Sequence, residues 1–157
     1  MSNNSIMTVL PVNVMSENAV RVLRTGAYAR VSTDKDDQAN SFESQVQYFS
    51  DYIQKQDGWK LVKVYADDGI TGTNTKNRDG FNDMIEDALS GKIDLIITKE
   101  VSRFARNAED TFKYTRRLKE KDVYAIFTLD GIDTREPESE LKLAIFAALA
   151  QEESRKT

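Results

Sequence analysis

The sequence of 157 residues contains no cysteine and no histidine. Without cysteine, the chain can form neither disulfides nor thiolate metal sites, which agrees with a reducing cytoplasm. Without histidine, Ser-His-Asp and Cys-His catalysis are excluded, and so are histidine-ligated metals and the usual proton carrier near neutral pH. Any chemistry must therefore use serine, threonine, tyrosine, lysine, arginine, aspartate or glutamate.

Long hydrophobic runs and an excess of positive charge are also missing. The longest apolar stretch covers residues 143–150, which is too short to cross a bilayer, and the amino terminus lacks the pattern of a signal peptide. We therefore expect a soluble, cytoplasmic protein that does not act at a membrane. The net charge of −4 and the pI of about 5.0 argue against a general nucleic-acid binder, because such domains usually carry an excess of positive charge.

The chain divides into a short arm and one domain. Residues 1–24 show no sustained periodicity, which predicts a flexible amino-terminal arm. Residues 25–157 are enough for a single domain with a hydrophobic core. The sequence ends in a charged stretch with neither a helix cap nor a breaker, so we expect a truncated domain whose last helix continues in the intact protein.

Apolar runs and amphipathic segments alternate along the domain. Strands are predicted over residues 25–31, 60–67, 93–98 and 123–130, and helices over 41–58, 80–92, 107–122 and from about 139 onward. Continuous apolar strands separated by helices predict a doubly wound α/β fold with a mostly parallel sheet covered on both faces. Ligands of such sheets bind at the carboxyl ends of the strands.

Charged and polar side chains follow the predicted strands. Arg30 and Ser32 end the first strand and, two residues apart in an extended chain, point to the same side. Arg103 and Arg106 follow the third strand, three residues apart in a turn that enters a helix, so their side chains can converge. Arg78 ends the polar loop after the second strand. If the strand order permits, four guanidinium groups and one hydroxyl gather at one edge.

This combination of side chains suits a phosphate group. Arginine offers a planar fork of donors and a permanent charge, which match a phosphate and the charge that spreads over its oxygens during phosphoryl transfer. A serine in the middle is then a candidate nucleophile. The alternative is that the strand-end arginines pair with the many acidic residues of the chain and that Ser32 only caps a turn.

Six motifs follow one another along the domain: "YARVSTD", "SFESQVQ", "GITGTNTKNRDGF", "VSRFARN", "LDGIDT" and "ALAQEESRK". In this order they resemble the catalytic domain of the serine site-specific recombinases, the resolvase and invertase superfamily. The resemblance covers about residues 25–157, and several motifs are most similar to those of the large serine recombinases that act as phage integrases and conjugative-transposon recombinases.

The resemblance implies a role for each matching residue. Ser32 matches the nucleophile, which attacks a DNA phosphodiester and leaves a 5′-phosphoserine linkage and a free 3′-hydroxyl. Gln45 and Glu153 match residues that lie at the same site. The arginines that match those holding the scissile phosphate are Arg30, Arg78, Arg103 and Arg106. Because a phosphoserine stores the energy of the broken ester, rejoining needs no cofactor and no metal.

How Ser32 loses its proton is left open by the sequence. A ring of fixed positive charge lowers the cost of an alkoxide, and Asp67, Asp68 or Glu153 are weaker candidates for the base. Small recombinases usually carry an aspartate where this chain has Ser102, so a proton-transfer role of that aspartate cannot be transferred.

The resemblance also implies partners. Double-stranded DNA with recombination sites is the expected substrate, and a homodimer or homotetramer is the expected assembly. The last helix is apolar on nearly all sides between Leu141 and Ala150, which predicts a subunit interface rather than a single buried stripe. We expect the isolated domain to bind DNA poorly and to be inactive.

Two other functions compete with recombination. The segment "TGTNT" superficially resembles a phosphate cradle of a flavodoxin-like cofactor binder, although it follows the second strand and not the first. The domain could also be a non-catalytic regulatory or dimerisation module of similar topology. A tyrosine recombinase is disfavoured because its phosphate site requires histidines. The polar stretch over residues 67–77 has little to bury, which predicts a mobile loop.

Overall fold

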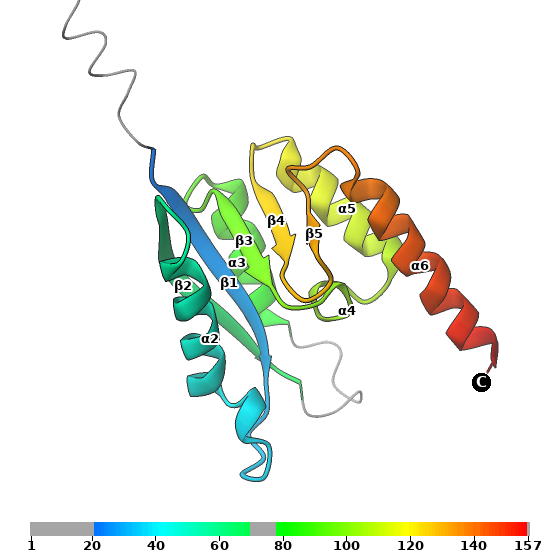
Figure 1. Cartoon of the computed structure of the whole chain (residues 1–157), viewed down its shortest axis with the longest axis horizontal. Helices are drawn as coiled ribbons and strands as arrows, with labels where there is room; N and C mark the ends of the chain where they lie inside the picture. The colour runs from blue at the N-terminus through cyan, green and yellow to red at the C-terminus, as the bar shows by residue number, and fades with distance from the viewer. Residues whose placement is uncertain (1–20, 70–77, 157) are drawn as a thin grey trace, which may run out of the picture.

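The computed structural model describes residues 21–69 and 78–156 of the chain, with side chains up to Glu152 (Figure 1). The arm predicted over residues 1–24 lies outside the described residues except at its end, where Leu23 and Arg24 already belong to the first strand. Most of the loop that was predicted to be mobile also lies outside them.

A five-stranded sheet runs through the molecule. Its strands are β1 (Leu23–Val31), β2 (Trp59–Asp68), β3 (Leu95–Thr98), β4 (Tyr124–Phe127) and β5 (Ile132–Asp133). The spatial order is β2-β1-β3-β4-β5, and the first four strands are parallel while β5 is antiparallel to β4. The mostly parallel sheet that the sequence predicted is confirmed. β5 was not predicted, because two residues are too short to show a periodic pattern.

Helices cover both faces of the sheet, as predicted (Figure 1). They are α2 (Phe42–Gln54), α3 (Asp79–Leu89), α4 (Val101–Phe104), α5 (Ala108–Lys119) and α6 (Ser139–Lys156), with the 3-10 helix η1 (Gln38–Asn40) before α2. α2 packs on one face, against alternate residues of β1 and β3, and the four later helices contribute to the core on the other face. Ser41 and Asn107 cap α2 and α5, because their side chains accept hydrogen bonds from the backbone N–H groups three residues onward.

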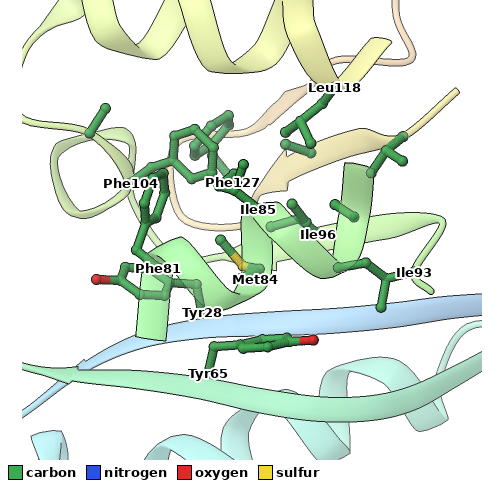
Figure 2. Packing of buried hydrophobic residues seen from close by; sticks show 14 of the residues in the cluster. Tyr28, Tyr65, Phe81, Met84, Ile85, Ile93, Ile96, Phe104, Leu118 and Phe127 are labelled. Atoms are coloured by element: carbon green, nitrogen blue, oxygen red, sulfur yellow. The ribbon is translucent and has the colours of Figure 1, made fainter. Parts of the chain in front are cut away.

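The larger core lies between the sheet and α3 (Figure 2). Side chains alternate along β1, so Tyr28 enters this core while Ala27 and Ala29 face α2. Phe81 of α3 packs edge to face with Tyr28, at 5.5 Å between ring centroids, and with Phe104 of α4, at 5.2 Å. Each such pair adds about 1 kcal/mol to the burial of the rings. The core therefore ties the start of α3 and the end of α4 to the carboxyl half of β1.

α6 leaves much of its apolar surface uncovered. Leu143 is buried in the core, whereas Leu141, Ile145 and Leu149 are 65%, 51% and 60% exposed. The C-terminal half of this helix extends beyond the sheet and the other helices (Figure 1). Among the described residues, no helix combines the length and the hydropathy that crossing a bilayer would require.

Candidate functional site

The carboxyl ends of β1, β2 and β3 meet at one edge of the sheet, because these strands are parallel neighbours. A cavity of about 110 Å³ lies at this edge, and three cationic side chains line it. Arg30 comes from the end of β1, Lys99 directly follows β3, and Arg103 comes from α4. We call this space the cationic cavity; its other lining residues are Tyr28, Ala29, Asn40, Gln45, Thr98, Glu100 and Leu129. Of the predicted site residues, it brings together Arg30, Gln45 and Arg103.

Arg30 enters the cationic cavity with an unsatisfied donor. Its Nε is buried and has no hydrogen-bond partner among the described residues. Gly69 lies so close that a Cβ on it would be 3.1 Å from the Cβ of Arg30, and its N–H donates to the carbonyl oxygen of Val31 at 2.9 Å. Gln45 is 3% exposed, and its Nε2 donates to the carbonyl oxygen of Ala39 at 3.2 Å. A buried donor without an acceptor costs free energy, which a ligand oxygen would recover.

Arg103 and Arg106 line different cavities, although their spacing predicted side chains that converge. α4 is a single turn, and the backbone at Ala105 is extended, with φ −136° and ψ 161°. The helical spacing therefore stops before Arg106. Arg106 lines a second cavity of about 210 Å³, which lies between α4, the start of α5 and α6 and includes Phe146.

Arg78 lies over the core and not in the lining of the cationic cavity. Its guanidinium carbon is 3.9 Å from the ring centroid of Phe81 and 5.8 Å from that of Tyr28. Its Nη2 donates a hydrogen bond to the carbonyl oxygen of Phe104, and its Nε is buried without a partner among the described residues. Tyr28 is also a lining residue of the cationic cavity, so Arg78 is separated from the cavity by a residue that it contacts.

Asp67, at the end of β2, connects β1 with the start of α3 through hydrogen bonds. Its carboxylate accepts hydrogen bonds from the Tyr28 hydroxyl at 2.8 Å and from the backbone N–H groups of Gly80 at 2.7 Å and Phe81 at 3.0 Å. Asp67 thereby caps α3, because the N-cap residue Arg78 makes no side-chain capping bond. Burial and the hydrogen bond to Asp67 raise the pKa of Tyr28 to about 12.

Ser32 lies just past the end of β1, in an open hollow formed by residues between 31 and 44. Its N–H donates to the carbonyl oxygen of Asn40 at 2.7 Å, and its Oγ accepts from the N–H of Asp34 at 3.1 Å. The hydroxyl therefore stabilises a turn, as the alternative interpretation expected. Ser32 is two positions after Arg30, so their Cα atoms are at most about 7 Å apart.

Two further residues that the sequence pointed to are Glu153 and Ser102. Glu153 belongs to α6, but its side chain lies outside the described residues, so its place at the site stays a prediction. Ser102 lines the second cavity together with Arg106, and its Oγ donates to Oε2 of Glu100 at 3.4 Å. Within residues 21–69 and 78–152, no group of three acidic side chains is arranged to hold a metal ion.

Two residues of this edge were not singled out in the sequence. Lys99 follows the third strand, but the sequence interpretation of that segment depended on the arginines after it. Tyr28 belongs to the first motif, where the pattern predicts only an ordinary strand residue. The signal for Lys99 was its position, since it is the first residue after β3 and so lies at the edge where ligands bind.

Comparisons with known proteins show the family of this chain. A family model described as the resolvase N-terminal domain matches residues 25–157. A resolvase family site-specific recombinase from Streptococcus pneumoniae is 30% identical, with a TM-score of 0.65, over 85% of this chain and 91% of that one. The N-terminal catalytic domain of TP901-1 integrase is 22% identical, with a TM-score of 0.66, over 84% of this chain and 97% of that one, and this likeness shows the fold.

A curated relative matches only a small part. The uncharacterized protein y4bA/y4pH of Sinorhizobium fredii is 34% identical over 56 residues, which are 34% of this chain. The match spans 8% of the length of that protein.

Proposed function

We propose that Ser32 is the nucleophile of this chain, which belongs to the resolvase N-terminal domain family and is the catalytic domain of a site-specific DNA recombinase. The Oγ of Ser32 attacks a DNA phosphorus. The new Oγ–P bond replaces the P–O3′ bond, so a 5′-phosphoserine and a free 3′-hydroxyl result. Ser32 loses one proton and the 3′ oxygen gains one. The reverse reaction with a 3′-hydroxyl from another strand rejoins the DNA without an external energy source.

The observation that supports this proposal most is the cationic cavity beside Ser32. Arg30 and Arg103 line it, and the Nε of Arg30 is buried without an acceptor among the described residues. A phosphate oxygen supplies such an acceptor, and its negative charge is stabilised by fixed guanidinium groups that need no reorganisation during the reaction. The neutral, polar residue Gln45 also lines this cavity.

The distribution of the other residues supports an inactive resting subunit. Ser32 lies in the neighbouring hollow, and Arg106 lines the second cavity. We propose that assembly on DNA brings the Ser32 hydroxyl and the Arg106 guanidinium to the phosphate held in the cationic cavity. Arg78, whose own Nε is buried without an acceptor among the described residues, contacts the lining residue Tyr28, and we propose that it joins them.

The test is a covalent protein–DNA adduct. The complete protein is incubated with DNA that carries candidate recombination sites, and the adduct is isolated and mapped by mass spectrometry. We expect a phosphoserine linkage at Ser32 and no adduct from Ser32→Ala. Ser44→Ala is the matched control, because Ser44 carries another hydroxyl in the same hollow. An adduct of normal yield from Ser32→Ala contradicts the assignment.

We also propose that α6 forms the contact between subunits, in a dimer that pairs to a tetramer on two DNA sites. Leu141, Ile145 and Leu149 are four residues apart in turn, so they form one exposed apolar stripe. Sedimentation with DNA tests this: Ile145→Lys should prevent assembly without lowering the melting temperature. Gln151→Lys, at an exposed polar position of the same helix, is the control. Assembly of Ile145→Lys at normal concentration contradicts the proposal.

A further inference from the structure

Lys99 stands at the centre of the strand-end edge and has no role in the function described so far. It directly follows β3, a central strand, and lines the cationic cavity with Arg30 and Arg103. Its Nζ lies 4.4 Å from the ring centroid of Tyr48 in α2. The Tyr48 hydroxyl shares a hydrogen bond of 2.8 Å with Oγ1 of Thr128, which fixes this ring beneath the ammonium group.

Charged groups from several elements line the cavity together with Lys99. Arg30 from β1 and Arg103 from α4 are cationic, and Glu100 is the one carboxylate among the described residues that line the cavity. The two titratable rings at the site are those of Tyr28 and Tyr48. Within the described part of the chain, three cationic side chains and one anionic side chain therefore line the cavity. The net positive charge of this lining favours an anionic ligand.

This environment lowers the pKa of Lys99. Burial is the main cause, the charge of Arg103 adds to it, and Glu100 offsets it in part. With these neighbours alone, the charged ammonium form of Lys99 is less favourable than it is in water. An anion placed between Lys99 and Arg103 would reverse this effect, because it favours the protonated form.

We propose that Lys99 is a further phosphate-binding residue of this recombinase, and that it holds a DNA backbone phosphate in the cationic cavity together with Arg30 and Arg103. This inference rests on the proposed function and assigns one more residue to its site. Phosphate entry draws a proton from solvent onto Lys99 when its ammonium has been partly deprotonated. The arginines cannot respond in this way, because they stay charged at every accessible pH. Lysine at this position makes phosphate binding weaken as the pH rises.

The first test measures binding without any reaction. The chain is prepared with ¹³C-labelled lysine, and the Lys99 Cε resonance is titrated with pH in the absence and presence of inorganic sulfate, which stays dianionic throughout. We expect sulfate to raise the pKa of Lys99 and Lys99→Met to bind sulfate at least about 5-fold more weakly. Lys63→Met is the matched control, because Nζ of Lys63 lies 4.9 Å from the Tyr65 ring centroid but outside the cavity. A Lys99 pKa that sulfate leaves unchanged overturns the proposal, and sulfate bound equally by Lys99→Met marks it as an adventitious ion only and overturns it too.

The second test measures adduct formation in the complete protein. Lys99→Met should lower the rate of adduct formation about 10- to 100-fold, whereas Lys63→Met leaves it unchanged. Lys99→Arg should restore most of the rate and remove its decline at alkaline pH, a readout that a purely structural role would not change. Normal rates in Lys99→Met overturn the proposal even where the adduct maps to Ser32. An adduct that persists in Ser32→Ala contradicts the nucleophile assignment and not the role of Lys99 in binding.

Discussion

Arg24 and Arg30 lie on the same strand, β1, and their guanidinium groups meet opposite conditions. At the amino end, Arg24 forms a paired interaction with Asp94: its Nε and Nη2 each donate to one carboxylate oxygen at 3.0 Å, and its backbone N–H donates at 2.9 Å. At the carboxyl end, Arg30 has a buried Nε without an acceptor among the described residues.

The same contrast extends to the other arginines. Away from the carboxyl edge, Arg116 pairs with Glu140 and Arg135 with Asp133. At that edge, within the described part of the chain, Arg30, Arg78 and Arg103 form no salt bridge. Carboxylates are not scarce, because the chain has 26 acidic residues against 22 basic ones. Among the described residues, these three arginines have no carboxylate partner, which leaves their positive charge available for an anionic ligand.

The largest effect is expected when the carboxyl edge loses an arginine. Arg30→Ala should lower the rate of DNA cleavage by about 10²- to 10³-fold, because one fixed donor to the phosphate is lost. Its melting temperature should stay unchanged, since no protein acceptor is left unpaired. Single-turnover adduct formation and thermal unfolding measure the two quantities. Strong destabilisation by Arg30→Ala would show that this arginine is structural, like Arg24.

Asp67→Ala should have the next largest effect, and on stability first. The change leaves the Tyr28 hydroxyl and the N–H groups of Gly80 and Phe81 without their acceptor in a buried corner. We expect a loss of about 3 kcal/mol in the free energy of unfolding by urea. DNA cleavage should also slow, because α3 carries Arg78 at its start.

The control for Asp67→Ala is Asp83→Asn on the exposed side of α3, which should change stability by less than about 0.5 kcal/mol. A stable Asp67→Ala variant would show that the cap of α3 does not depend on this carboxylate.

The contrast between the two arginines also shows what the sequence could predict. Arg30 lies at the end of a strand and Arg103 shortly after one, and the rule that ligands bind at the carboxyl ends of parallel strands predicted that they meet. Gln45 was assigned by resemblance alone, because a polar residue on a helix does not reveal that it is buried. The apolar residues of α2 are only partly buried: Phe49 lies in the core, whereas Phe42 is 46% exposed.

The differences have physical causes that a pattern does not contain. The spacing of Arg103 and Arg106 predicted one helical face, but the chain leaves the helix at Ala105 after a single turn. Lys99 carries no motif of its own, and its interest depends on which strands are neighbours in space. Asp67 was considered as a proton acceptor, yet three hydrogen-bond donors already use its carboxylate.

The interactions at the two ends of β1 should lose their contributions to stability at opposite extremes of pH. Tyr28, near the carboxyl end, has a pKa raised to about 12, above its value of about 10 in the unfolded chain. Its contribution to stability is therefore complete below about pH 10 and is lost as the pH rises toward 12, by at most about 2 kcal/mol. Urea unfolding at alkaline pH should show this loss. Tyr28→Phe should remove it, and an unchanged alkaline decline in that variant would assign the loss to Tyr65, whose pKa is also raised.

The smallest effect belongs to the amino end. The hydrogen bond from Arg24 holds the pKa of Asp94 below its usual range, so its contribution to stability is present above about pH 4 and is lost as the pH falls through the lowered value. Asp94→Asn should cost about 1 kcal/mol at neutral pH, remove this part of the acid decline, and leave DNA cleavage unchanged. Urea unfolding as a function of pH measures the first two. Slower cleavage by Asp94→Asn would mean that the two ends of β1 are coupled, and the separation of structural from ligand-binding arginines would then fail.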